Sequence, residues 1–201
     1  MLHYKTIELQ TLKLLKELQV NSLFQNTCLV GGTALALQIG HRQSIDLDIF
    51  GYIPYSSEEI RNSLVGHDVT ILKESENINI YKVDDIKVDF VNYRYKWIEQ
   101  PFEEKGIKLA SIKDIAAMKV YAAIGRGTKK DFIDIYYLLK KFSINEILDL
   151  YMQKYPEGSR FIAMKSLVYF DDAEHDPMPL MFRKIKWDSI KKSICKAVRE
   201  I

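Results

Sequence analysis

The stretch Val30-Gly31-Gly32-Thr33 is followed, eleven residues after Thr33, by the segment Ser44-Ile45-Asp46-Leu47-Asp48-Ile49-Phe50. The apolar residues around the two aspartates predict a β-strand over 44–50 with one buried face. Because side chains alternate faces along a strand, Asp46 and Asp48 share a face. Like charges side by side on a strand are destabilising, and a divalent cation is the usual reason to keep them. The pattern indicates metal-assisted phosphoryl or nucleotidyl transfer with Mg²⁺ or Mn²⁺; the alternative is a solvated edge strand.

The composition is that of an ordinary globular protein. The chain has 201 residues, of which 47% are hydrophobic and 28% charged, enough for one domain or two small ones. A net charge of +2 implies no polycationic surface, so any nucleic-acid contact depends on local clusters. Cys28 and Cys195 lie far apart and predict neither a disulfide framework nor a zinc site. With no signal peptide and no apolar run of about 18 residues, we expect a soluble cytoplasmic protein without membrane contact.

The order of elements predicts an α/β (α+β) fold. Strands are expected over residues 27–30, 44–50, 69–72, 78–83 and 86–91, and helices over residues 6–20, 33–39, 112–123, 130–142, 144–155 and 187–201, with a further helix start at Ser56 and a loop over 170–179. The polar break Pro101–Gly106 is the expected boundary. We therefore predict an α/β domain over residues 1–105, built on a mixed sheet, and a mainly helical domain over 106–201 that closes a cleft.

The two glycines predict a close backbone approach. Without Cβ atoms, Gly31 and Gly32 let the chain bend and approach a phosphate, and the amides of the following helix bind anions. Thr33 adds a hydroxyl donor, and Ser44 is a further candidate contact to a nucleotide. The alternative is a plain strand-to-helix turn.

Asp89 is a candidate third carboxylate. It lies within the apolar segment Ile86-Lys87-Val88-Asp89-Phe90-Val91, where it could complete a metal site with Asp46 and Asp48 or act as a general base. The alternative is an ion pair with Lys87 or Arg94. The pair His41-Arg42 precedes the carboxylate strand and could contact a triphosphate or an acceptor, or simply be exposed.

A second informative site lies in the expected helices after residue 111. Lys119 is one charge in an apolar run, so it either faces solvent or points across a cleft at nucleotide phosphates. Asp131 and Asp134 are spaced i, i+3 and share a helix face. Arg126 and Lys130 lead into them as candidate nucleotide contacts. For Asp131, helix capping and salt bridging are the alternative to a catalytic role.

The remaining aromatic and basic residues have default interpretations. The tyrosines of the second half, such as Tyr136, Tyr137 and Tyr155, are expected in the core or an interface rather than as base-stacking platforms. The tail Trp187–Ile201 has a basic face, for which a solvated surface is the default and an RNA or partner contact the alternative.

Together these residues resemble the nucleotidyltransferase superfamily, whose pattern is a Gly-Gly or Gly-Ser turn, Asp-x-Asp, and a third Asp on a later strand. More narrowly, Gly-Gly-Thr-Ala-Leu-Ala followed by His-Arg-x-Ser-x-Asp-Leu-Asp-Ile-Phe resembles the AbiEii/AbiGii toxin family. That family's later block, Met-Lys-x-x-Ala and then Arg-Gly-x-x-Arg-Asp-x-x-Asp-x-x-x-Leu-Leu, is matched from Met118 to Leu139. The chain departs from it at Lys130, where the family has arginine, so bidentate pairing is lost.

The resemblance implies a toxin of an abortive-infection or toxin–antitoxin system with a separately encoded antitoxin. It implies use of a nucleoside triphosphate and, in some relatives, addition of nucleotides to the 3′ end of tRNA. By residue, Asp46 and Asp48 would hold Mg²⁺, Asp89 would orient or deprotonate an acceptor hydroxyl, Lys119 would neutralise phosphate charge, and Asp131 would orient Lys119 or Arg126. Two hypotheses compete with an RNA-directed toxin: a nucleotidyltransferase with a small-molecule or protein acceptor, and a non-catalytic binding protein of the same fold.

Overall fold

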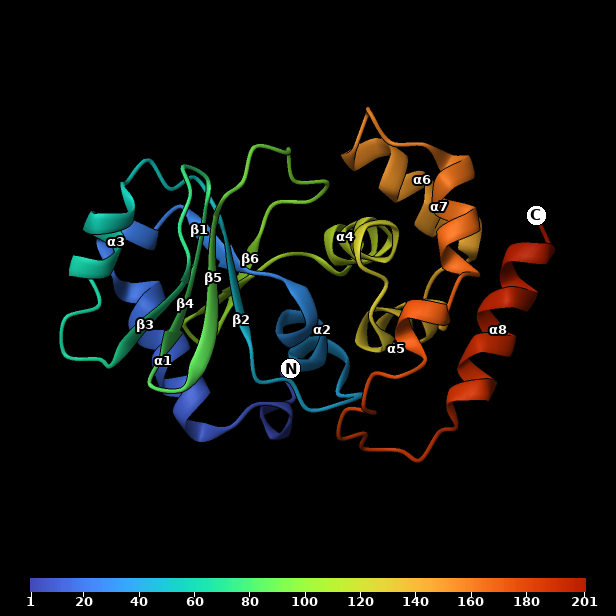
Figure 1. Ribbon diagram of the computed structural model, residues 1–201, viewed down its shortest axis with the longest axis horizontal. Helices are drawn as coiled ribbons and strands as arrows, with labels where there is room; N and C mark the ends of the chain where they lie inside the picture. Colours follow the sequence, from blue (N-terminus) through green and yellow to red (C-terminus); the bar gives the residue numbers. More distant parts are fainter.

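A seven-stranded mixed sheet forms the centre of the computed structural model, which describes residues 1–201 (Figure 1). The strands are β1 (Thr27–Leu29), β2 (Leu47–Gly51), β3 (Val69–Lys73), β4 (Ile78–Val83), β5 (Ile86–Asn92), β6 (Phe102–Glu104) and β7 (Ile107–Leu109), in the spatial order β3-β4-β5-β2-β1-β7-β6. The β2–β5 and β1–β7 pairs are parallel, and the other four are antiparallel. The two strands that carry the predicted carboxylates, β2 and β5, are therefore direct neighbours.

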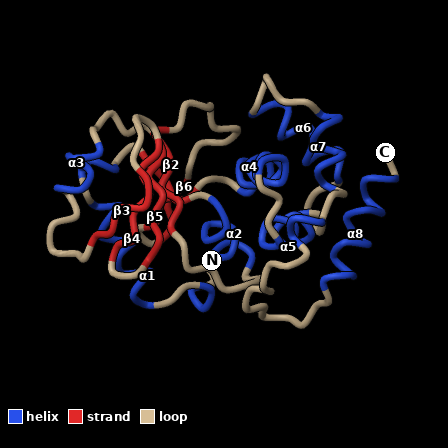
Figure 2. Tube along the Cα trace, in the orientation of Figure 1, coloured by secondary structure: helices blue, strands red, loops and turns tan.

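Eight α-helices cover this sheet and extend beyond it. They are α1 (Leu9–Val20), α2 (Gly31–Ile39), α3 (Ser57–Asn62), α4 (Ile112–Gly125), α5 (Lys129–Leu138), α6 (Ile144–Lys154), α7 (Arg160–Leu167) and α8 (Trp187–Arg199). Helices α1 and α3 lie on one side of the sheet and α2 on the other, while α5, α6 and α7 pack around α4 and α8 packs outside α5 and α7 (Figures 1 and 2). A single hydrophobic cluster of 45 buried residues runs through both halves, which fixes α4 against the sheet side of the molecule.

The expected fold class is confirmed, a mixed sheet followed by a mainly helical half. The expected helices and strands before residue 92 are also present. Helix α2 starts at Gly31 itself and is stopped at Gly40, as expected. Gly40 follows the last helical residue and has a φ of +66°, the left-handed backbone conformation that commonly ends a helix. Helix α3 begins after a capping box between Ser56 and Glu59.

The carboxylate strand is shorter than expected, and this corrects the argument that Asp46 and Asp48 share a strand face. Strand β2 begins at Leu47, because pairing with β5 starts at Leu47 opposite Val88. Asp46 precedes the strand, in a loop whose backbone bonds elsewhere: the Ser44 amide donates to the Thr6 carbonyl at 2.8 Å.

The expected polar break over residues 101–106 is instead part of a β-hairpin. Lys105 and Gly106 have φ values of +54° and +76°, the positive pair that a tight two-residue hairpin turn requires. Strand β7 then pairs with β1, so the sheet continues to Leu109. The division into units 1–105 and 106–201 stays a prediction. Helix α7 was not expected, and none of the helices is long and apolar enough to cross a membrane.

Candidate active site

The turn between β1 and α2 brings the backbone against two charged side chains. Gly31 has a φ of +66°, and a Cβ placed on it would lie 1.9 Å from Oδ2 of Asp48. A Cβ on Gly32 would lie 2.2 Å from Nη2 of Arg42. Both positions therefore require glycine, the first for its backbone conformation as well as for space. The turn closes over the carboxylate and the guanidinium instead of serving only as a connection.

Asp48 and Asp89 face each other across the parallel pair β2–β5, where they are register partners. The pKa of Asp48 is raised to about 6, first by burial and then by the charge of Asp89, against which Lys119, Lys87 and Arg126 act. Lys87 Nζ lies 2.5 Å from Oδ1 of Asp89. The Lys87–Asp89 ion pair that the sequence left open is thus present, and it leaves the negative charge at Asp48 incompletely compensated.

The donor chemistry of this pair fits a hard divalent cation. Carboxylate oxygens are the ligands that Mg²⁺ prefers, and the raised pKa of Asp48 marks a place where added positive charge is favourable. The chain does not, however, hold three acidic, His or Cys side chains grouped as a preformed metal site. Asp46 lies on the loop before β2, with Oδ2 3.9 Å from Nζ of Lys130, and it lines the same hollow as Asp48. Of the three predicted ligands, the structure places only Asp48 and Asp89 in register.

A buried ion-pair network, which we call the Lys119 cluster, adjoins the two carboxylates. It consists of Lys119 on α4, Asp131 and Asp134 on α5, and His41 and Arg42 on the loop before β2. Lys119 Nζ lies 2.9 Å from Oδ1 of Asp131 and 2.7 Å from Oδ2 of Asp134. Arg42 donates twice to Asp134, at 2.7 and 2.9 Å, and His41 Nε2 lies 2.7 Å from Oδ1. One carboxylate, Asp134, thus binds three basic side chains from two distant segments.

The charges in this cluster stabilise one another. Burial opposes the charged form of Asp134, but Arg42 and Lys119 outweigh it and hold its pKa well below the usual range. Burial likewise opposes the charge of Lys119, whose pKa Asp131 and Asp134 nevertheless raise. Burial lowers the pKa of His41, whereas the contact between its Nε2 and Asp134 raises it. The cluster therefore holds Lys119 charged in a fixed position.

Two hollows meet at these residues. The first, which we call the polar pocket, has a volume of about 340 Å³ and no hydrophobic lining residue. The second, the aromatic cleft, has a volume of about 710 Å³, and its aromatic wall consists of Phe50, Tyr93, Tyr95, Tyr121 and Tyr155. Asp48, Lys119 and Arg126 line both. The charged centre therefore lies where a hollow without hydrophobic lining residues adjoins a largely apolar one.

The other predicted nucleotide contacts are distributed unevenly around this junction. Gly32, Arg42, Ser44 and Lys130 line the polar pocket, and Gly31 lines the aromatic cleft. Thr33 lines neither, because its hydroxyl lies 2.8 Å from Ser44 Oγ and also bonds the Asp46 carbonyl. The Arg126 side chain is 66% exposed while its Nε lies 3.2 Å from Asp131 Oδ2, so it can reach a ligand.

Several of the open alternatives are decided by this geometry. Lys119 does not face solvent, and Arg42 is not an exposed base, since their side chains are 6% and 2% exposed. Asp131 does form salt bridges, to Lys119 and Arg126, and it accepts a hydrogen bond from Thr128 Oγ1 at 2.7 Å. Tyr155 is buried, as expected, but it also lines the aromatic cleft.

Sequence reasoning missed the central position of Asp134 and the contribution of Asp176 to the polar pocket. The i, i+3 spacing of Asp131 and Asp134 was the available signal for the first. Asp176 gave none, because it comes from a loop: its Oδ2 accepts from the Lys129 amide at 2.9 Å, 47 residues earlier in the chain.

Comparison with known proteins assigns the chain to a family. The family model for the AbiEii toxin, a nucleotidyl transferase of type IV toxin–antitoxin systems, matches residues 13–200. A protein of Aquifex aeolicus (strain VF5), described as uncharacterized protein aq_aa25, is 36% identical over 181 residues, which cover 86% of each chain.

Solved structures share the fold. JHP933 from Helicobacter pylori superposes with a TM-score of 0.60 at 17% identity, covering 96% of this chain and 92% of that one. MenT4, a nucleotidyltransferase toxin from Mycobacterium tuberculosis H37Rv, superposes with a TM-score of 0.61 at 16% identity, covering 94% and 81%. The fold, the paired carboxylates and the family match agree: the chain belongs to the AbiEii nucleotidyl transferase toxin family.

Proposed function

We propose that this toxin is a metal-dependent nucleotidyltransferase that moves a nucleoside monophosphate from a nucleoside triphosphate to RNA, with the 3′ end of tRNA as the acceptor. The observation that carries the proposal is the junction of the two hollows at Asp48, Lys119 and Arg126. The polar pocket has the size and lining for phosphates, whereas the aromatic cleft has room for nucleosides.

The basic side chains would bind the triphosphate. Lys119 is held charged by Asp131 and Asp134, so its position does not depend on the ligand. Arg126 and Lys130 are more exposed and would close onto the phosphates from the rim of the polar pocket. Because fixed charges need no reorganisation when substrate charge develops, Lys119 would contribute most to transition-state stabilisation.

The carboxylates would bind the metal ion and take the proton during transfer. A divalent cation held by Asp46, Asp48 and Asp89, Mg²⁺ or Mn²⁺, would offset phosphate charge and polarise the α-phosphorus. Asp89 would orient an acceptor hydroxyl and take its proton. The hydroxyl oxygen then bonds to the α-phosphorus, the bond from that phosphorus to the bridging oxygen of the β-phosphate breaks, and pyrophosphate leaves.

A toxin of this kind requires an antitoxin partner and access to RNA, and we propose that both are met in the cytoplasm as part of an abortive-infection response. Transfer to a small molecule or a protein is the competing enzymatic function, and the same hollows would serve it. A non-catalytic role is disfavoured because Gly31 leaves the space that the Asp48 side chain occupies, and Asp48 is in register with a second carboxylate, Asp89.

The experiment is label transfer. Purified protein, Mg²⁺ and each α-³²P-labelled nucleoside triphosphate in turn are incubated with total RNA, beside an Asp46→Ala/Asp48→Ala variant. We expect labelled RNA with the wild-type chain alone. Label on the protein itself, or turnover that needs no RNA, would replace the RNA acceptor by the competing one. No transfer to any acceptor would favour the non-catalytic role.

A further inference from the structure

A third hollow lies on the far side of the Lys119 cluster, and its charged lining is exclusively basic. We call it the basic pocket. It has a volume of about 380 Å³ and is lined by His3, Ile39, Gly40, His41, Tyr137, Lys140, Lys141 and Arg183. None of these is acidic. No carboxylate lies within the 4.0 Å ion-pair distance of Lys140, Lys141 or Arg183. Three cations therefore line one hollow without an acidic partner.

We propose that the basic pocket binds a backbone phosphate of the RNA acceptor. The assignment rests on the proposed function for the choice of RNA, but the phosphate chemistry comes from the pocket itself. Like charges gathered in a hollow repel one another, and an anion removes that cost. Lys140 is also held in place, with Nζ 4.5 Å and 4.4 Å from the ring centres of Tyr136 and Tyr137. An ordinary solvated lysine has no such support.

The basic pocket is physically connected to the active site. His41 lines the basic pocket and Arg42 lines the polar pocket, and both bind the same carboxylate, Asp134. A second connection is an extended segment that crosses this loop. The Gln43 amide donates to the Leu180 carbonyl at 2.8 Å, and the Phe182 amide donates to the His41 carbonyl at 3.2 Å.

That segment, residues 177–183, has one end at each of the two pockets. Pro177 lines the polar pocket and Arg183 lines the basic pocket. A polynucleotide, which carries phosphates in a chain, can place one phosphate in each pocket, whereas a free phosphate ion occupies only one.

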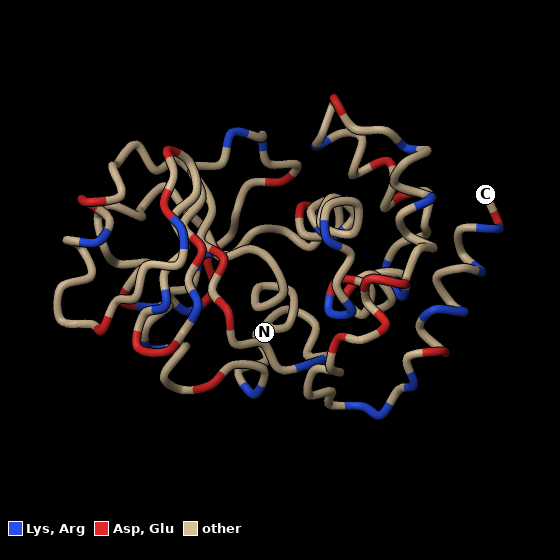
Figure 3. The backbone as a smooth tube through the Cα atoms, in the orientation of Figure 1, with Lys and Arg blue, Asp and Glu red and all other residues tan.

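Basic residues continue beyond the pocket in the same direction. Lys140 also lines a neighbouring hollow of about 560 Å³, to which α8 contributes Lys196 and Glu200, whose Nζ and Oε1 lie 3.7 Å apart. The loop before α8 adds Lys184 and Lys186 beside Arg183, and Figure 3 shows Lys and Arg positions along this loop and on α8. The tail that was expected to have a basic face thus shares a hollow with Lys140 of the basic pocket, and the RNA backbone would continue from the pocket towards it.

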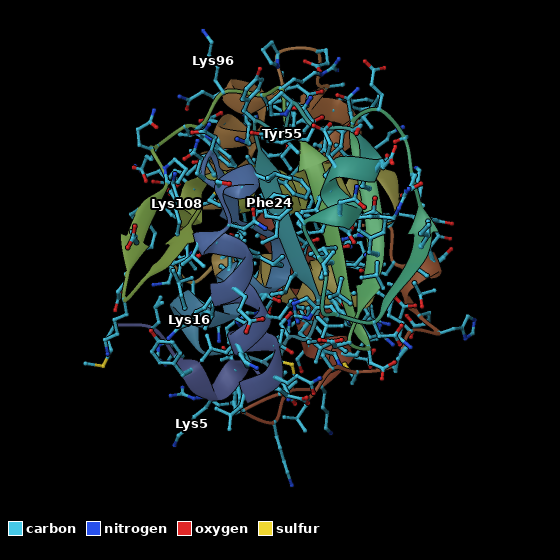
Figure 4. All side chains as sticks on the ribbon, turned by 90° about the vertical axis from the view of Figure 1, so that its left-hand side faces the viewer. Lys5, Lys16, Phe24, Tyr55, Lys96 and Lys108 are labelled. Atoms are coloured by element: carbon cyan, nitrogen blue, oxygen red, sulfur yellow. The ribbon has the colours of Figure 1, made fainter.

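The test compares two triple variants with equal loss of charge. Lys140→Ala/Lys141→Ala/Arg183→Ala removes the basic pocket, and Lys5→Ala/Lys16→Ala/Lys108→Ala removes three lysines from the sheet side, which Figure 4 labels. Binding of bulk tRNA is measured as a function of salt, binding of the nucleoside triphosphate is measured separately, and thermal melting confirms that both variants fold.

We expect the pocket variant to bind tRNA roughly 10- to 100-fold more weakly, with the slope of log K against log salt reduced by about 2. The sheet-side variant should bind tRNA within about twofold of wild type, and triphosphate binding should be unchanged in both. A Lys140→Arg/Lys141→Arg variant, which keeps the charge, should bind tRNA like wild type.

Three outcomes would overturn the proposal. Equal weakening in the two triple variants would mean that overall charge, not the pocket, binds RNA. Weaker triphosphate binding in the pocket variant would make the pocket part of the nucleotide site. Unchanged tRNA binding, with loss of stabilisation by inorganic phosphate or pyrophosphate, would assign the pocket to a free phosphate. The binding measurement does not depend on nucleotidyl transfer. If tRNA binds at the pocket but is never labelled, the proposed function is contradicted and the proposed RNA site is not.

Discussion

Two buried ion-pair clusters meet at helix α4, and only one of them lines the two hollows of the active site. At the start of α4, Asp114 binds Lys154 of α6 at 2.6 Å, and both side chains are fully buried. Asp114 also accepts hydrogen bonds from the amides of Ile98 and Glu99 and from Ser111 Oγ. We call this the Asp114 cluster. About one and a half turns further along α4, the Lys119 cluster lines both hollows of the active site.

The difference lies in where the charges are directed. Asp114 is bonded only by other groups of the protein, in the loop after β5, at the start of α4 and on α6. This cluster therefore ties that loop to the two helices. In the Lys119 cluster, Lys119 and Asp131 line the polar pocket while Asp134 anchors them from behind. The same residue types thus stabilise the fold in one place and position charge for a ligand in the other.

The largest expected effect is common to both clusters. Removing the shared carboxylate by Asp114→Ala or Asp134→Ala leaves a buried lysine, or a buried arginine, without its partner. Each change should lower the free energy of unfolding by about 3–5 kcal/mol, as measured by urea denaturation. A loss below about 1 kcal/mol at Asp134 would mean that the Lys119 cluster is dispensable for folding.

The next effect separates the clusters. Lys119→Met should lower kcat for nucleotidyl transfer by about 100-fold or more, because a fixed charge beside the reacting phosphates is lost. Lys154→Met, the matched control, should lower stability by about 1–3 kcal/mol and leave kcat of the folded enzyme unchanged. Steady-state kinetics at a temperature where both variants are folded makes the comparison. An equal loss of kcat in the two would abolish the distinction.

A smaller effect is expected at the exposed edge of the Lys119 cluster. Arg126 is mostly solvent-exposed and meets Asp131 at the rim of both hollows. Arg126→Ala should raise the KM for the nucleoside triphosphate about tenfold while changing stability by no more than about 0.5 kcal/mol. A stability loss comparable to that of Asp134→Ala would place Arg126 among the structural residues instead.

The smallest effect is a pH dependence confined to the active-site side. In the protein without bound metal, Asp48 has a pKa of about 6, so about half of it is protonated at pH 6. Because the pKa is raised in the folded state, the native protein holds this proton more tightly than the unfolded chain. Stability from this group should therefore rise as the pH falls from 7 towards 4. Asp48→Asn should remove that component from the melting curves.

Sequence patterns predicted the parts of this site that are local. The glycine turn, the Asp-x-Asp motif, Asp89 and the i, i+3 aspartates were all found in single segments. What could not be predicted are the partners, since Asp134 meets Arg42 across 92 residues and Asp176 reaches the site from a loop. The β6–β7 hairpin was missed because Lys105 occupies a turn position where Asn or Asp is the usual signal.

The most direct test of the account is the single change Asp48→Asn, with transfer and stability measured on the same preparation. The amide keeps the shape but removes the charge that burial and Asp89 disfavour. We predict that nucleotidyl transfer falls at least about 1,000-fold, while the free energy of unfolding without ligands at pH 7 is unchanged or rises by about 1–3 kcal/mol. Full transfer activity, or a clear loss of stability, would contradict the claim that Asp48 is kept for chemistry at the expense of the fold.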